Sequence, residues 1–398
     1  MKRILFLMSD TGGGHRAAAE AVVAALEIRY PGEFRSRLVD GWRHTPFPFK
    51  YSPETYEPTV RYGRLGWWAG YKITNGPTAA RVAMLPMYHA LFKSGMKRIL
   101  RAFHDVDLIV CVHSVFVRPT VRALIGQERR PPILTIVTDL VSTHMWWYDP
   151  TWTAAWSPPK PPTSAACAQA SRRSRCASPG CRCTPRFAEG LMDKAEARAA
   201  LGWDADLPAV LVIGGGAGMG PLYAIARAIN AKGAWCQLAV VAGRNESLKA
   251  RLDAATWRQP THIYPYVHNM PTMMAAADIL VTKAGPGTIS EACIAGVPIV
   301  LSGAIPGQEE GNITFVVRSG AGVWAPGPHR VADAVASWLA EGREGLARRA
   351  AAAKALGRPN AVWEIAEEVR HYASQPRVIV DERGNRRTAL LPHAGSRS

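Results

Sequence analysis

A short glycine-containing segment, KAGPGT at residues 283–288, has the composition of a phosphate-binding turn. It follows an apolar run at 279–281 and precedes a helical string at 289–294. Glycines let a ligand approach the backbone, and the free N–H groups at a helix start carry a partial positive charge that favours a diphosphate. The alternative is a buried crossover whose glycines only make a tight turn. The candidate residues here are Lys283, Gly285, Gly287 and Thr288.

Polar residues on both sides of the next apolar run extend this candidate site. Glu291 lies about one turn into the helix, where a carboxylate can accept hydrogen bonds from both hydroxyls of a ribose. The cluster Gln308, Glu309 and Asn312 follows the run at 297–301 and suits a hydroxyl-rich group such as a sugar. Strand, glycine turn, helix, strand and polar loop make half of a nucleotide-binding α/β unit. Together they indicate a nucleotide-sugar site.

A second glycine loop, residues 9–14, lies between an expected strand at 3–8 and an alanine-rich helix at 15–30. It reads GGGH and does not meet the GxGxxG fingerprint of dinucleotide sites. His15, at the mouth of the helix, can exchange a proton near neutral pH. A helix N-terminus lowers the pKa of a histidine, which favours the neutral form that a general base requires. His15 is therefore a candidate base, and the alternative is that it caps the helix or binds a phosphate.

Further candidates follow other expected strands, at the edge where an open α/β sheet places its ligands. His113, after a strand at 108–112, and Asp139, after a strand at 133–137, are second-rank candidates for the acceptor site, although either residue could equally belong to a structural turn. A glycine run at 214–220 follows a strand at 209–213, and Arg244, after a strand at 238–241, can neutralise a phosphate. Asp105-Val106-Asp107 has the form of a DxD metal signature but precedes its strand, so we expect no metal site there.

Three of these segments together resemble a known family. TKAGPGTISEA (282–292), IPGQEEGN (305–312) and MSDTGGGHR (8–16) are similar to motifs of family 28 glycosyltransferases, specifically monogalactosyldiacylglycerol synthases and related diacylglycerol glycosyltransferases. The resemblance covers about residues 1–150 and 186–345. It implies a GT-B architecture, with two Rossmann-like α/β domains and an active site in the cleft between them. It also implies roles for Gly13 and Gly14 in the acceptor loop and for the backbone at Val267 and His268 beside the uracil ring. Gly215 and Gly216 are donor candidates on their own chemistry, because the glycine run that holds them makes a turn suited to an anion.

The activity that the resemblance implies is inverting transfer of galactose or glucose from a UDP-sugar to diacylglycerol, with His15 as the base. The helix N-terminus at Gly287 and Thr288 would stabilise the leaving UDP, so we expect neither a metal nor a cofactor. One alternative is transfer of N-acetylglucosamine to a lipid-linked peptidoglycan precursor. Another, from a different class, is a basic nucleic-acid-binding protein.

Composition bounds these possibilities. The chain has 398 residues, enough for two domains, and its net charge of +17 calls for an anionic partner such as a membrane surface or a nucleic acid. The acceptor chemistry favours the membrane, and we expect no nucleic acid. No apolar run reaches the roughly 20 residues of a membrane span, and residues 2–8 resemble a first strand more than a signal peptide. We therefore expect a cytoplasmic protein associated peripherally with the inner face of the cell membrane.

Residues 41–101 combine many cations with interleaved aromatic residues, a pattern typical of membrane surfaces and also of single-strand binders. Within them, residues 84–103 have apolar residues at helical spacing beside a basic flank, which predicts an interfacial amphipathic helix. The alternative is a pair of core helices with a solvated basic face.

The expected organisation is an acceptor domain at 1–150, an anomalous segment at 151–185, a donor domain at 186–345, a C-terminal helix at 346–372 and a disordered tail at 373–398. The anomalous segment holds four of the seven cysteines and shows no strand or helix period. Three interpretations compete: a disordered linker, a zinc site with atypical spacing, and a reading-frame error. Reading the segment in a shifted frame permits a strand–helix–strand sequence that resembles the family's interdomain segment. If the printed residues are genuine, the chain could be an inactive lipid-binding remnant.

Overall fold

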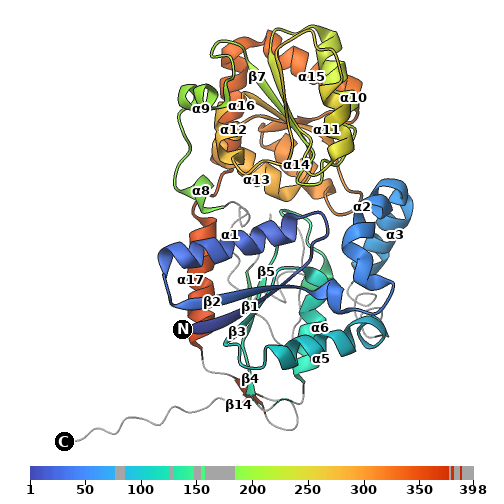
Figure 1. The fold of residues 1–398 in the computed structure, drawn as a ribbon, viewed down its shortest axis with the longest axis vertical. Coiled ribbons are helices and arrows are strands. Elements are labelled where there is room, and N and C mark those ends of the chain that lie inside the picture. The colour runs from blue at the N-terminus through green and yellow to red at the C-terminus, as the bar shows by residue number, and fades with distance from the viewer. Residues whose placement is uncertain are drawn as a thin grey trace, which may run out of the picture.

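The computed structural model describes residues 1–76, 86–125, 127, 129–147, 154–156, 184–375, 378–380 and 386–387. Two α/β domains, each built on a parallel sheet, are stacked along the long axis of the molecule (Figure 1). The carboxyl ends of the strands in both sheets lead into the loops between the domains. The chain therefore has the GT-B architecture expected from its motifs.

The N-terminal sheet has the order β2-β1-β3-β5-β6, and all of its neighbouring strands are parallel. Both faces of its central strands are covered, which is why they read as continuous apolar runs. Ala154–Trp156 forms the edge strand, so the expectation of no strand in the anomalous segment is wrong at these residues. Residues 157–183, on which its three interpretations fall, lie outside the described residues. The strands are β1 (Lys2–Met8), β2 (Phe34–Asp40), β3 (Leu108–Cys111), β5 (Ile133–Ile136) and β6 (Ala154–Trp156).

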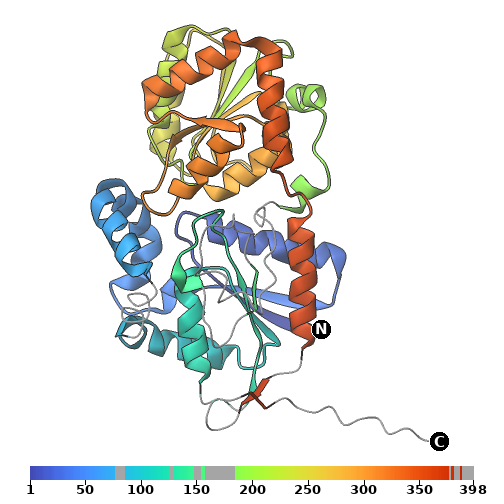
Figure 2. The same cartoon turned by 180° about the vertical axis from the view of Figure 1, so that it is seen from behind.

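Helices cover both faces of this sheet and extend to one side of it (Figures 1 and 2). They are α1 (Gly14–Arg29), α2 (Ser52–Tyr62), α3 (Arg64–Thr74), α5 (Lys93–Ala102) and α6 (Ser114–Leu124), with short 3₁₀ helices η1 (Gly41–His44), η2 (Phe49–Tyr51) and η4 (Met145–Trp147) and a π-helical turn, η3 (Tyr88–Phe92).

The prediction of an interfacial helix at 84–103 is wrong for its described part. Phe92, Met96 and Ile99 are fully buried and pack in the core of the N-terminal domain with Leu5 and Phe116. The apolar stripe of α5 faces the sheet because that face offers continuous apolar contact. Its basic residues remain on the solvent side, as the alternative interpretation held.

The C-terminal sheet has the order β12-β11-β10-β7-β8-β9 and is also parallel throughout. Its strands are β7 (Ala209–Ile213), β8 (Gln237–Val241), β9 (Thr261–Tyr264), β10 (Ile279–Lys283), β11 (Ile299–Gly303) and β12 (Gly322–Trp324). Its helices are α9 (Lys194–Leu201), α10 (Leu222–Lys232), α11 (Glu246–Asp253), α12 (Met270–Ala276), α13 (Pro286–Ala295), α14 (Glu310–Arg318), α15 (Pro328–Ala340) and α16 (Gly342–Ala355).

The last long helix, α17 (Ala361–Ser374), returns to the N-terminal domain and packs beside α1 (Figure 2). Val362, Ile365 and Val369 on its inner face are buried, and each fully buried side chain of this size contributes about 1.5–3 kcal/mol. The short helix α8 (Pro185–Ala188) links the domains on the same side. Part of the tail predicted to be disordered is ordered: β13 (Val378–Val380) pairs with β4 (Arg129–Arg130) and β14 (Arg386–Arg387).

Candidate active site

The two glycine loops face each other across the domain junction, and Arg244 lies between them. A Cβ atom placed on Gly13 would be 3.9 Å from Arg244 Nη1, and one placed on Gly216 would be 3.6 Å from the same atom. The guanidinium stacks on the ring of Tyr266, 4.3 Å from its centroid. The geometry thus brings a delocalised cation, suited to phosphate oxygens, to the point where both loops approach.

Tight backbone contacts fix the position of Arg244. Its backbone N–H donates to Gly216 O at 2.9 Å. A Cβ on Gly218 would collide with Ala242 O, and Gly243 has a φ of +64° with Gly216 O beside it. Side chains at these two glycines would push apart the loops after β7 and β8. Gly218 and Gly243 therefore allow the two loops to pack closely, and this packing fixes Gly215, Gly216 and Arg244 relative to one another.

His15 stands in the first turn of α1, at the opening of the N-terminal glycine loop. Its Nδ1 lies 2.8 Å from Val112 O and 2.9 Å from Thr138 Oγ1. A carbonyl can only accept, so the Nδ1 proton of a neutral imidazole is directed at Val112, and Nε2 carries the lone pair. This is the tautomer that a general base needs. Gly13, with φ of +76°, is the helix cap, so His15 does not cap the helix.

His113 and Asp139, the second-rank acceptor candidates, lie next to His15 but already have protein partners. The His113 ring centroid is 4.4 Å from that of His15, and its Nδ1 accepts from Val115 N as the cap of α6. Burial lowers the pKa of His113 to about 3, so it stays neutral beside His15. Asp139 Oδ2 accepts from Trp147 Nε1 at 2.6 Å. Both residues therefore shape the wall around His15.

In the donor segment, the helix after the glycine turn starts earlier than the sequence predicted. Helix α13 starts at Pro286, with Gly285 as a cap that has no side chain, so the first-turn N–H groups near Gly287 and Thr288 have no helical partner. Gly285 has an ordinary φ of −70°; a Cβ there would lie 2.9 Å from Lys283 Nζ. A side chain at position 285 would displace the Lys283 ammonium from its place beside Glu309, whereas the backbone conformation itself does not demand glycine.

The polar cluster after β11 divides into two kinds of residue. Glu309 is almost fully buried, and both of its oxygens are used internally: Oε1 by Lys283 Nζ at 2.6 Å and Oε2 by Ile305 N at 2.9 Å. Asn312 Nδ2 donates to Ala284 O at 2.9 Å, and its buried Oδ1 has no partner in the described part of the chain. Glu309 thus fastens the loop to the glycine segment, and Asn312 keeps one acceptor for a ligand.

The remaining donor candidates lie after the carboxyl ends of β9, β10 and β11. Gln308 and Glu291 are half-buried, the latter in the second turn of α13. Val267 is half-buried just beyond β9, and His268 is exposed, with its ring 5.1 Å from that of Tyr266. His268 therefore lies on the same aromatic residue that Arg244 covers.

Sequence reasoning missed residues that reach the cleft from α2 and α3. A Cβ on Gly12 would be 3.3 Å from the Tyr56 ring, and one on Gly307 would be 3.0 Å from the Tyr71 ring. His144 Nε2 is 3.1 Å from Thr74 Oγ1, which joins the end of α3 to the loop after β5. The only signal was the aromatic-rich composition of residues 41–101, which does not specify these contacts.

Acidification is expected to weaken this part of the fold through His144. Burial lowers its pKa to about 4 from an ordinary 6.5, so between these pH values the unfolded chain binds a proton that the native chain does not. Stability therefore falls as pH decreases from 6.5 to 4, at a limiting rate of about 1.4 kcal/mol per pH unit. His144→Asn keeps an acceptor for Trp146 N, and its urea-unfolding free energy should depend less on pH over this interval. Equal pH slopes in both proteins would contradict the assignment.

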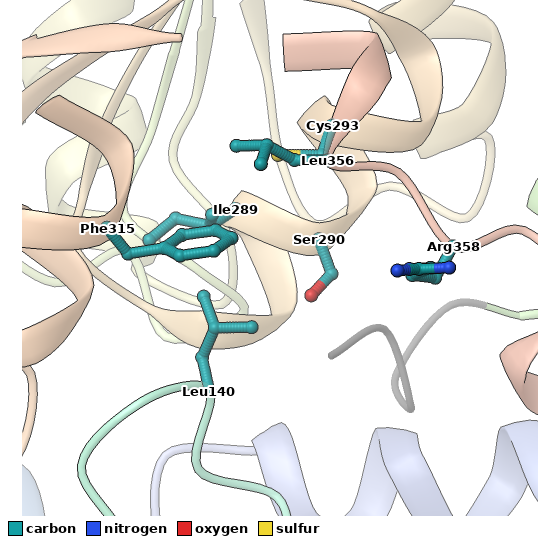
Figure 3. Close-up of a pocket in the computed structure, with 7 residues that line it drawn as sticks. All are labelled: Leu140, Ile289, Ser290, Cys293, Phe315, Leu356 and Arg358. Atoms are coloured by element: carbon teal, nitrogen blue, oxygen red, sulfur yellow. The ribbon is translucent and has the colours of Figure 1, made fainter. Parts of the chain in front are cut away.

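Two pockets adjoin the cleft. An open pocket of about 360 Å³ lies between Glu57 of α2 and the C-terminal domain, where it is lined by the glycine loop and Arg251. Figure 3 shows a smaller apolar pocket in which Leu140 of the N-terminal domain points toward Ile289 and Phe315. Leu140 thereby joins the hydrophobic core of the C-terminal domain. Among the described residues, no group of His, Cys, Asp and Glu could hold a metal ion.

The sequence matches two protein-family models. Residues 15–172 match monogalactosyldiacylglycerol (MGDG) synthase, and residues 209–314 match the glycosyltransferase family 28 C-terminal domain. The first match extends past residue 150, where the resemblance was expected to end. The first model covers α1 from His15 onward in the N-terminal domain, and the second covers the donor segment of the C-terminal domain.

Curated relatives agree with these models. Monogalactosyldiacylglycerol synthase 1, chloroplastic, of Arabidopsis thaliana is 34% identical over 92% of this chain and 70% of its own length. The probable monogalactosyldiacylglycerol synthase, chloroplastic, of Glycine max is 35% identical over 94% and 72%. Similarity on this scale includes both domains.

Solved structures show the same fold at lower identity. MurG of Acinetobacter baumannii has a TM-score of 0.57 at 17% identity, covering 93% of this chain and all of MurG. Anabaena HepE in complex with UDP-glucose has a TM-score of 0.54 at 16% identity, covering 94% of this chain and all of that one. With the family models and the curated relatives, these findings place the chain in the monogalactosyldiacylglycerol synthase family of glycosyltransferases.

Proposed function

We propose that this chain transfers galactose from UDP-galactose to diacylglycerol, with inversion at the anomeric carbon. The observation that carries the proposal is the position of Arg244 between the two glycine loops, with His15 at the opening of the same cleft. A cation and a neutral imidazole are what a sugar nucleotide and an alcohol nucleophile require. The monogalactosyldiacylglycerol synthases that the chain resembles supply the identity of sugar and lipid.

In the proposed reaction, His15 Nε2 takes the proton of the diacylglycerol hydroxyl as its oxygen attacks the anomeric carbon. The glycosidic bond to UDP breaks in the same displacement, and negative charge develops on the diphosphate. The first-turn N–H groups of α13 and the Arg244 guanidinium stabilise that charge. Gln308 and the unpaired Oδ1 of Asn312 bind hydroxyls of the sugar. In this scheme the protein's own groups stabilise the negative charge on the diphosphate, and neither metal nor cofactor takes part.

The donor nucleotide would extend away from His15 along the C-terminal domain. Glu291 would hold the ribose, and the backbone at Val267 and His268 would flank the uracil ring. Lys283 and Glu309 would keep the loop after β11 against the glycine segment. Gly13 and Gly14 would leave room for the acceptor's glycerol.

The decisive experiment is incubation of the purified protein with labelled UDP-galactose or UDP-glucose and liposomes containing diacylglycerol. Lipid extraction should recover label in the organic phase, more with UDP-galactose than with UDP-glucose. An organic phase without label from either donor would overturn the proposal. Preference for UDP-N-acetylglucosamine and a lipid-linked saccharide precursor would favour the alternative transferase.

Exposed apolar residues around α2 and α3 support access to the acceptor from an anionic membrane. Phe47, Leu65 and Ile73 are 78%, 84% and 67% exposed, and the cations Lys50 and Arg64 are close to Phe47 and Leu65 along the chain. Apolar side chains beside cations suit the headgroup region of a bilayer. No helix among the described residues is long and apolar enough to cross the bilayer. We therefore propose peripheral binding through this surface.

Substituting two of these residues is expected to weaken membrane binding. A fully buried aliphatic side chain contributes about 1.5–3 kcal/mol, so two side chains each inserted to about half of their surface contribute about 1.5–3 kcal/mol together. Leu65→Ser with Ile73→Ser should therefore lower liposome affinity about 10- to 100-fold. Sedimentation with liposomes containing anionic lipid measures this. The matched control is Ile28→Ser with Ile125→Ser, which alters two similarly exposed side chains on other elements. Equal loss of liposome affinity in both pairs would contradict membrane binding through α2 and α3. Tighter binding of the protein to DNA than to liposomes at the same salt would contradict a membrane partner.

A further inference from the structure

The hairpin formed by α2 and α3 belongs to the N-terminal domain but reaches the donor loop of the other domain. It lies at the side of the domain junction in both views (Figures 1 and 2). The ring of Tyr71 covers Gly307, and Lys72 Nζ of the same helix is 3.7 Å from Glu310 Oε2. Two successive residues of α3 thus contact the loop before α14 and the first residue of that helix.

The hydroxyl of Tyr71, at the other end of the ring from the atoms that contact Gly307, is buried and has no hydrogen-bond partner within the described residues. Native proteins pair nearly all buried polar groups, and exceptions often mark a place where a ligand or a water completes the pairing. The buried Oδ1 of Asn312 is also without a described partner, and it follows the same loop. Two unpaired groups, one donor and one acceptor, therefore flank residues 305–311.

The charges around Tyr71 indicate what kind of ligand fits. Burial raises the pKa of Tyr71, and the nearby carboxylates of Asp139 and Glu310 raise it further, so the phenol stays protonated and able to donate. Carboxylates repel a phosphate but accept hydrogen bonds from hydroxyl groups. The cationic place for a diphosphate is at Arg244 instead. A neutral ligand rich in hydroxyls suits the Tyr71 side.

From this arrangement we propose that the Tyr71 hydroxyl donates a hydrogen bond to a hydroxyl of the donor hexose, so that the acceptor-side domain completes the sugar pocket across the cleft. This inference rests on the proposed function, because it takes a UDP-hexose as the ligand. Tyr71 is then a residue that distinguishes UDP-sugar from UDP. Its ring contact with Gly307 ties recognition of the hexose to the approach of the two domains.

Isothermal titration of Tyr71→Phe with UDP and with UDP-galactose tests the proposal without an acceptor. The substitution removes one oxygen and keeps the ring on Gly307. UDP affinity should stay within about twofold of the wild type, whereas UDP-galactose affinity should fall about three- to tenfold, as expected for a lost neutral hydrogen bond. Tyr30→Phe, at the C-terminal cap of α1 and so at the opposite end of that helix from the glycine loop, is the matched control and should change neither affinity.

The contrary outcomes separate this inference from the proposed function. If the wild type binds both nucleotides and Tyr71→Phe weakens both equally or neither, the Tyr71 role is wrong and the proposed function stands. If the wild type binds neither nucleotide, both fail. A thermal unfolding midpoint for Tyr71→Phe well below that of the wild type, together with equal loss of both ligands, would assign Tyr71 a purely structural role.

Discussion

Replacing His15 by alanine is expected to lower kcat about 10²- to 10⁴-fold, the usual contribution of a positioned general base. The Nδ1 proton is directed at Val112 O, so Nε2 is the nitrogen that accepts a proton in the neutral ring. Alanine removes that acceptor but leaves the donor half of the cleft intact. UDP-galactose affinity should therefore remain within about twofold, which places the loss in the chemical step. Initial rates with saturating donor and diacylglycerol liposomes measure the effect.

The control for His15→Ala is His104→Ala, which removes an exposed histidine between α5 and β3, at the edge of the N-terminal sheet opposite the carboxyl ends of its strands. It should retain wild-type kcat. The acid limb of the pH–rate profile is a second readout, since protonation of the base stops the wild-type reaction as pH falls. A His15→Ala protein with more than about a tenth of wild-type kcat would show that another group removes the proton.

Much of the fold could be predicted because buried parallel strands leave continuous apolar runs, and glycine loops follow them. The strands at β1, β7 and β10 were located from sequence in this way, and so were the loops that follow them. Helix boundaries were less certain: α13 begins at Pro286, three residues before the expected start. A proline suits the first turn, so the glycine turn and the helix overlap.

Contacts between distant segments could not be predicted. Nothing in the spacing of residues places Arg244 beside Gly13, because that contact depends on how two separately folded domains meet. The helix at 93–102 has the pattern of an interfacial helix, and only packing against the sheet shows that its apolar face is internal. Glu309 was assigned to the sugar from its position after β11, yet in the structure both of its oxygens hold the loop. Local sequence specifies which groups are available, whereas the tertiary fold decides their partners.

Arg244→Ala is expected to weaken binding of both UDP and UDP-galactose by about 10- to 100-fold, which corresponds to about 1.5–3 kcal/mol for a charged hydrogen bond. The guanidinium lies at the junction of the loops and has the planar donor geometry that phosphate oxygens need. The catalytic rate should fall further, because the charge on the diphosphate increases as the glycosidic bond breaks. Arg244→Lys should recover part of the affinity but less of the rate, since an ammonium binds phosphate as a point charge. Calorimetry and initial rates provide the two quantities.

Arg227→Ala is the matched control, because Arg227 also covers an aromatic ring in the same domain, 5.4 Å from the centroid of Trp257, on an outer helix. Both variants lose a cation and a ring contact, but only Arg244 faces Gly13 and Gly216. If affinity for UDP falls equally in both, the loss comes from general charge or stability. If Arg244→Ala leaves UDP affinity unchanged, the diphosphate does not lie between the two loops. The diphosphate would then have to be held by the helix N-terminus at Gly287 and Thr288, without the guanidinium.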